Sequence, residues 1–236
     1  MSDRIEAIRE AERKSHTEIY STAKLFEKGS WLAKPVKTVM DLLPMLREKN
    51  PVTILDLGCG VGRNCIPLAK ELSENNCKTD AVDILEFAIE ELTVNSKNHG
   101  VHESINPIVS SIDDFVIEPD KYDLIIAVSA LEHVSSEKVF QKKLHEINDG
   151  LKQGGIVCLI ANSEVTETDN SVNSRVDPQF EVNIKAEEMI SLLNGAFENA
   201  ELLKVSVSEQ NYDIPRENFI SALSTKVVTF VAQKVK

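Results

Sequence analysis

Three glycines that alternate with other residues follow a short apolar run, and this feature constrains the fold more than any other. Residues 53–57 (Thr-Ile-Leu-Asp-Leu) predict a buried strand, and Gly58, Gly60 and Gly62 come directly after it. Glycine is needed where the backbone turns sharply or passes close to a ligand without a Cβ in the way. A helical segment begins at residue 63, so the amides of its first turn suit an anionic group. The sequence therefore predicts a strand, a ligand-binding turn and a helix in direct succession.

Strand-like and helix-like segments continue to alternate as far as residue 161. Such alternation is typical of βαβ units and of a parallel sheet, which defines the α/β class. The predicted strands of this part are residues 53–57, 78–82, 106–110, 124–128 and 156–161, and the predicted helices are residues 63–75, 85–98 and 137–152.

The pattern changes after residue 161. Residues 162–178 are polar with no apolar period, and long structureless loops are commonly lids or binding loops, so we expect a candidate lid over residues 162–180. A helix is predicted at residues 186–193. Strands at 201–208 and 227–233 have no helix-length apolar period between them, which favours an antiparallel pair at a sheet edge. Seven strands result, the last of them antiparallel.

The N-terminal part is predicted to be helical. Apolar residues recur at roughly helical spacing over residues 2–28, before Gly29, and a second helical segment at 36–47 is expected to bend or break near Pro44. We therefore expect a helical cap or lid over residues 1–50, followed by a single α/β domain over residues 51–236.

Charge and composition restrict the partners. The chain has 26 Lys and Arg residues against 38 Asp and Glu residues, a formal net charge of −12. Affinity for nucleic acid rests largely on Lys and Arg. A small-molecule substrate is therefore expected and a nucleic-acid partner is not.

Cysteine spacing and hydropathy indicate a cytoplasmic protein. No apolar run approaches the length that spans a bilayer, and the first residues are charged, unlike a signal peptide. We expect no membrane partner. The four cysteines show no CxxC spacing, and His145-Glu146-Ile147-Asn148-Asp149 has an aspartate where a zinc-binding HExxH motif needs histidine. We expect no disulfide and no metal.

The turn resembles motif I of class I S-adenosylmethionine-dependent methyltransferases. Its spacing is GxGxG, with Asp56 two positions before the first glycine, whereas nicotinamide-binding turns read GxGxxG. The resemblance covers residues 53–161 and implies a Rossmann-like three-layer α/β sandwich with S-adenosyl-L-methionine as cofactor and S-adenosyl-L-homocysteine as product. The run Gly62-Arg63-Asn64 is also similar to tellurite-resistance-type small-molecule methyltransferases, and Asn64 is a further candidate cofactor-binding residue.

The resemblance assigns cofactor roles along the first two strands. The glycines would wrap the methionine half, with Cys59 contributing backbone and Asp56 on the amino-group side. Asp83 ends the second strand, where an acidic side chain can accept hydrogen bonds from both ribose hydroxyls. Ile84 would pack on the adenine.

The third and fourth strands complete the predicted cofactor site. Ser111 stands where many relatives carry Asp, so either Ser111 or Asp113 is the expected partner of the adenine amino group, with Ile112 in contact with the ring. Val128 and Ser129 would lie at the carboxyl edge of the sheet, where open α/β sheets bind ligands.

His133, in a family-like Glu-His-Val sequence, faces the cofactor in the predicted arrangement. Methyl transfer needs a base only when the nucleophile carries a proton of high pKa. His133 is therefore a candidate catalytic base, with packing or helix capping as the alternative.

The predicted activity is methyl transfer to a small molecule by a monomer or homodimer. Three alternatives remain: an inactive S-adenosylmethionine-binding regulatory protein, a methyltransferase of macromolecules, and a nicotinamide-dependent oxidoreductase.

Overall fold

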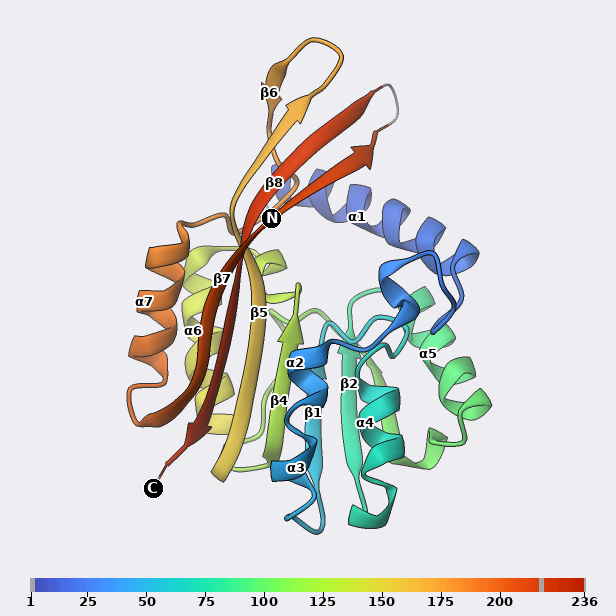
Figure 1. Cartoon of the computed structure of the whole chain (residues 1–236), viewed down its shortest axis with the longest axis vertical. Coiled ribbons are helices and arrows are strands. Elements are labelled where there is room, and N and C mark those ends of the chain that lie inside the picture. The colour runs from blue at the N-terminus through green and yellow to red at the C-terminus, as the bar shows by residue number, and fades with distance from the viewer. Residues whose placement is uncertain (1–2, 217–218, 236) are drawn as a thin grey trace.

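The computed structural model describes residues 3–216 and 219–235, which form one mixed sheet with helices on both faces (Figure 1). The sheet contains eight strands among these residues: β1 (Thr53–Leu57), β2 (Lys78–Asp83), β3 (Ile105–Val109), β4 (Tyr122–Val128), β5 (Leu151–Asp169), β6 (Ser174–Val176), β7 (Ala200–Pro215) and β8 (Ile220–Lys234). Their order is β3-β2-β1-β4-β5-β8-β7, and β6 pairs with β5 outside this path.

The strand directions confirm the predicted α/β class. β3, β2, β1, β4 and β5 pair in parallel, whereas β8 is antiparallel to both of its neighbours. All seven predicted strands are present, the last of them antiparallel as expected. The short β6 is an additional strand.

Helices cover the two faces of the sheet because successive strand residues point to opposite sides. Ile54 packs with α2, α3 and α4, while its neighbour Leu55 packs with α6 and α7. α5 packs beside α4. The helices are α1 (Asp3–Thr22), α2 (Lys37–Met40), α3 (Leu43–Leu46), α4 (Cys65–Glu71), α5 (Glu86–Asn98), α6 (Glu137–Gly150) and α7 (Ala186–Ala196).

The N-terminal segment forms one long helix and two short ones. α1 ends at Thr22, earlier than predicted, and the expected break near Pro44 is present because this proline lies in the first turn of α3. α1 lies across the end of the molecule to which the carboxyl ends of the parallel strands point (Figure 1). The division into a helical cap over residues 1–50 and an α/β domain over residues 51–236 stays a prediction.

The prediction of a structureless loop over residues 162–180 is wrong for residues 162–169 and 174–176, which are strands. β5 continues to Asp169 and pairs with β6 and β8, and β7 and β8 lengthen with it. Together these strand extensions form a projection that we call the arm, made of the described residues of 162–176 and 208–227 (Figure 1).

A buried ion pair accounts for part of the polar character of the arm sequence. The carboxylate of Glu167 is 1% exposed and accepts two hydrogen bonds of 2.6 Å from Arg216 and a third of 2.6 Å from Ser221. These polar residues therefore lie at interior positions of the strands. Strand prediction expects apolar residues at such positions, so the sequence did not indicate these strands.

Among residues 3–216 and 219–235, no helix combines the length and the apolar character needed to cross a lipid bilayer.

Candidate functional site

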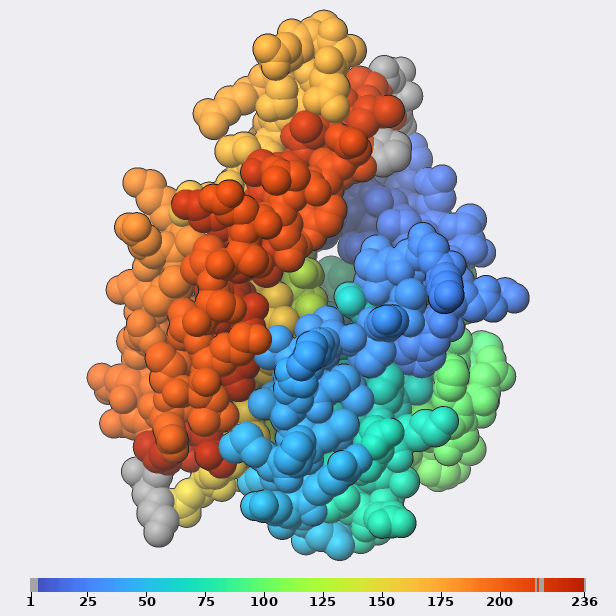
Figure 2. All heavy atoms as spheres, in the orientation of Figure 1, coloured from blue at the N-terminus to red at the C-terminus, as the bar shows by residue number. Residues whose placement is uncertain are grey.

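A cavity of about 390 Å³ lies at the carboxyl ends of β1, β2 and β4, with α1 on one side and Tyr212 of the arm on another. Figure 2 shows the surface hollowed between the arm and the N-terminal segment. The cavity brings together twelve of the residues predicted from the sequence: Gly58, Cys59, Gly60, Asn64, Asp83, Ile84, Ser111, Ile112, Asp113, Val128, Ser129 and His133.

The glycine turn fits its surroundings only because it lacks side chains. Gly58 has φ +73°, and a Cβ there would lie 2.4 Å from the Cβ of Ala130. Gly60 has φ +51°, and its Cβ would lie 2.8 Å from the hydroxyl oxygen of Tyr20 on α1. The turn is thus a cradle that a Cβ would fill, and α1 closes over it.

Asp56 and Gly62 are the two predicted residues that do not line the cavity. A Cβ at Gly62 would meet side chains of α4 and α5, so this glycine serves helix packing. Asp56 is 1% exposed, and its Oδ2 has no hydrogen-bond partner within the described residues. Burial and the nearby Asp83 raise the pKa of Asp56 to about 7, against the opposing effect of Cys65. Asp56 therefore lies beneath the turn.

Asp83 joins the end of β2 to the glycine turn. Its Oδ2 accepts a hydrogen bond from the Gly60 amide and its Oδ1 accepts one from the Leu85 amide, both at 2.9 Å. Burial raises the pKa of this carboxyl. Because each carboxylate oxygen has a second lone pair, Asp83 can still accept from two ribose hydroxyls. Ile84 beside it is 45% exposed and offers an apolar surface to a ring.

The loop after β3 holds α1. Asp113 accepts hydrogen bonds from the amide and hydroxyl of Ser135, and its other oxygen accepts one of 2.7 Å from Arg9 on α1. Burial raises the pKa of Asp113, but these partners outweigh it and lower the pKa below its ordinary value. Ser111 hydrogen bonds to Asp114 at 2.7 Å. The choice between Ser111 and Asp113 as the adenine partner stays open, although Asp113 already anchors α1.

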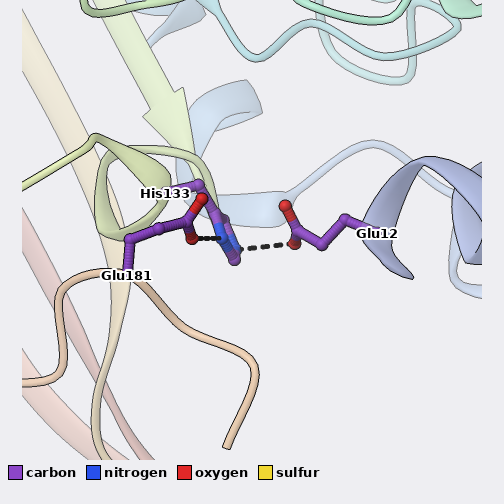
Figure 3. A group of neighbouring side chains, drawn as sticks. All are labelled: Glu12, His133 and Glu181. Atoms are coloured by element: carbon purple, nitrogen blue, oxygen red, sulfur yellow. Dashed lines mark hydrogen bonds and ion pairs between the residues drawn. The ribbon is translucent and has the colours of Figure 1, made fainter. Parts of the chain in front are cut away.

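His133 lies between two carboxylates (Figure 3). Its Nδ1 is 2.9 Å from Glu181 and its Nε2 is 3.1 Å from Glu12 of α1. Burial alone lowers the pKa of His133, but the hydrogen bond to Glu181 and the charge of Glu12 raise it to about 9. The ring is therefore a cation that donates from both nitrogens. The base role of His133 stays a prediction, and this arrangement does not favour it.

Glu12, His133 and Glu181 also have potential ligand atoms within 4.8 Å of one another. Both ring nitrogens of His133 already face carboxylate oxygens, so a metal ion would have to displace one of these bonds. The arrangement is that of a hydrogen-bonded ion cluster.

A polar stripe on α1 contains two cavity residues, Arg9 and Glu12, that the sequence did not lead us to expect. Arg9, Glu12, His16 and Tyr20 all line the cavity. His16 stacks on Tyr20 with ring centroids 5.5 Å apart, and burial together with the charge of His133 lowers the pKa of His16 to about 4. Spacings of three and four residues put these side chains on one helix face. That spacing was the signal that could have revealed them.

Arg63 and Asn64 tie the N-terminal segment to the glycine turn. Arg63 donates a hydrogen bond of 2.8 Å to the carbonyl of Lys34, and its guanidinium lies 5.3 Å from the ring centroid of Trp31. Asn64 accepts a hydrogen bond of 3.0 Å from the Val36 amide. Arg63 also lines the cavity and brings a positive charge beside the turn.

The parallel strands, the glycine turn after β1 and the acidic residue ending β2 agree with the Rossmann-like arrangement expected of class I S-adenosylmethionine-dependent methyltransferases. Residues 54–155 match the family model described as "Methyltransferase domain". This part of the chain is therefore a methyltransferase domain, of the S-adenosylmethionine-dependent kind.

The relatives align with different shares of this chain. The carboxy-S-adenosyl-L-methionine synthase of Colwellia psychrerythraea is 26% identical over 79% of this chain and 75% of its own length. The ubiquinone biosynthesis O-methyltransferase of Rickettsia conorii is 34% identical over 41% of this chain, which spans about a third (31%) of that relative. TehB from Haemophilus influenzae has the same fold, with a TM-score of 0.62 and 18% identity over 94% of this chain and 66% of TehB. This agrees with the tellurite-resistance-type resemblance at the level of the fold.

Proposed function

We propose that this enzyme transfers the methyl group of S-adenosylmethionine to a small-molecule acceptor bound against α1. The observation that carries the proposal is the polar face of α1, which shares one cavity with the predicted cofactor-binding residues. The volume of about 390 Å³ is in the range of small-molecule sites. A net charge of −12 disfavours a nucleic-acid acceptor.

The residues present fit the cofactor. The glycine cradle accepts a close ligand, Asp83 and Ile84 suit the ribose and the adenine, and Arg63 suits the methionine carboxylate. When bound, S-adenosylmethionine supplies a methyl group activated by a sulfonium. The residues of this chain then orient the acceptor and exclude water, which are the main contributions a protein makes to such a displacement.

Transfer of labelled methyl groups tests the proposal. The purified enzyme is incubated with S-adenosyl[methyl-³H]methionine and either a metabolite extract that passes a small-pore filter or a mixture of total tRNA and denatured protein. We expect label in the filterable products of the first reaction. Label only in acid-precipitable tRNA or protein would favour a macromolecular acceptor, and cofactor binding without any transfer would favour the inactive regulatory protein.

A further inference from the structure

When Glu12 is ionised, the ion cluster around His133 carries one negative charge in excess. Arg9 lies 2.7 Å from Asp113 and 3.5 Å from Glu181, and His133 bridges Glu181 and Glu12. Three carboxylates thus share two cations. Glu132 and Asp83 also act on Glu12, and both are acidic, while Arg13 on the same cavity wall pairs with Glu10 at 3.8 Å. No contribution from Glu132 or Asp83 offsets the excess.

The excess charge is accessible at Glu12. The Glu181 side chain is fully buried, and Asp113 is occupied by Ser135 and Arg9. Glu12 is 25% exposed and lines the cavity together with His133. Its carboxylate is therefore the one in the cluster that a bound acceptor can reach.

We propose that Glu12 accepts the proton of the methyl acceptor, and that the acceptor is consequently a hydroxyl or an amine. This inference rests on the proposed function. As the bond from the acceptor oxygen or nitrogen to the methyl carbon forms, the sulfonium S–C bond breaks. The O–H or N–H proton passes to Glu12, which later releases it to solvent. The products are the methylated acceptor and S-adenosylhomocysteine.

The cluster keeps Glu12 suited to this task. Burial raises the pKa of Glu12 and the charge of His133 opposes it, which leaves the pKa at about 7. A base is most effective when its pKa is near the working pH. His133 acts as a positioning residue that holds the carboxylate of α1 at the cavity wall. A thiolate acceptor would not require such a base.

The test compares wild-type enzyme with Glu12→Gln and with Glu10→Gln, a matched control whose side chain on the same helix is 73% exposed. The first readout is the ¹⁵N chemical shift of the His133 ring against pH, assigned through His133→Gln. We expect a doubly protonated ring at pH 7.5 and a small step near pH 7 as Glu12 ionises. Glu12→Gln should abolish the step and let His133 lose its proton at lower pH, whereas Glu10→Gln should change neither.

The second readout is S-adenosylhomocysteine formation with 3,4-dihydroxybenzoate, phenethylamine and thiophenol, which also separates hydroxyl from amine acceptors. Glu12→Gln should reduce turnover of the hydroxyl or amine substrate by about 100-fold and remove the rise in rate through pH 7. Turnover of thiophenol alone, or turnover unaffected by Glu12→Gln, would overturn the inference. If no probe reacts, the titration decides, and a neutral His133 at pH 7 or a step that persists in Glu12→Gln overturns it. Failure of the proposed function is separate, because it appears in the labelling experiment on the wild-type enzyme, as label only in tRNA or protein or as no transfer at all.

Discussion

An alanine at position 60 tests whether α1 closes over the glycine turn. Gly60 has φ +51°, and a Cβ at this position would lie 2.8 Å from the Tyr20 hydroxyl oxygen but 3.5 Å from the ring carbon that carries it. The left-handed backbone should cost about 1–2 kcal/mol. Displacing the hydroxyl should cost about 1–3 kcal/mol more, as overpacking typically does. We therefore expect Gly60→Ala to lower the free energy of unfolding by about 2–5 kcal/mol.

The variant Tyr20→Phe separates these two costs. Without the hydroxyl, the nearest atom of residue 20 is the ring carbon at 3.5 Å, which is an ordinary contact. Gly60→Ala in the Tyr20→Phe background should therefore cost only the backbone part, about 1–2 kcal/mol. Urea unfolding of the four proteins in a double-mutant cycle measures the difference. A coupling energy within about 0.5 kcal/mol of zero would refute the placement of α1 over the turn.

Three further predictions concern the cofactor, the arm and α1. Asp83→Ala should weaken S-adenosylhomocysteine binding by at least about 10-fold in calorimetry, because it removes a charged acceptor worth about 1.5–3 kcal/mol; unchanged affinity would remove Asp83 from the site. Glu167→Ala should destabilise the arm by about 3 kcal/mol, because Arg216 loses its buried partner, and should speed trypsin cleavage after Arg216; unaltered cleavage would speak against this. The pKa of Asp113 is lower in the folded protein than its ordinary value of about 4. The ionised carboxylate therefore stabilises the folded protein above about pH 4, and this stabilisation is lost as the pH falls further. Hydrogen exchange in α1 should accelerate at such pH in the wild type, and Asp113→Asn should show this acceleration already at pH 7.

The central part of the fold could be predicted from the sequence because its signals are local. β1 has the predicted bounds, and the glycine turn follows it as expected. Each parallel strand is an apolar run followed by a turn or a helix, so the periodicity of the sequence is enough to locate the strand. Asp83 reaches the cavity because it ends a strand whose neighbours all end at the same edge.

The arm and the wall formed by α1 could not be predicted in the same way, because their stability depends on distant polar partners. Glu167 is buried through Arg216, which lies 49 residues away, and neither residue marks a strand by itself. Arg9 and Asp113 are 104 residues apart, and His133 meets Glu181 only after the chain has passed through β5. A search for buried positions by hydrophobicity alone overlooks all of these residues.

The most direct test of the account is isothermal titration of the purified protein with S-adenosylhomocysteine, with NADH as the control. We expect one site per chain with micromolar affinity for S-adenosylhomocysteine, and no heat from NADH. Absence of binding, or binding of NADH in its place, would contradict the assignment of the cavity to S-adenosylmethionine.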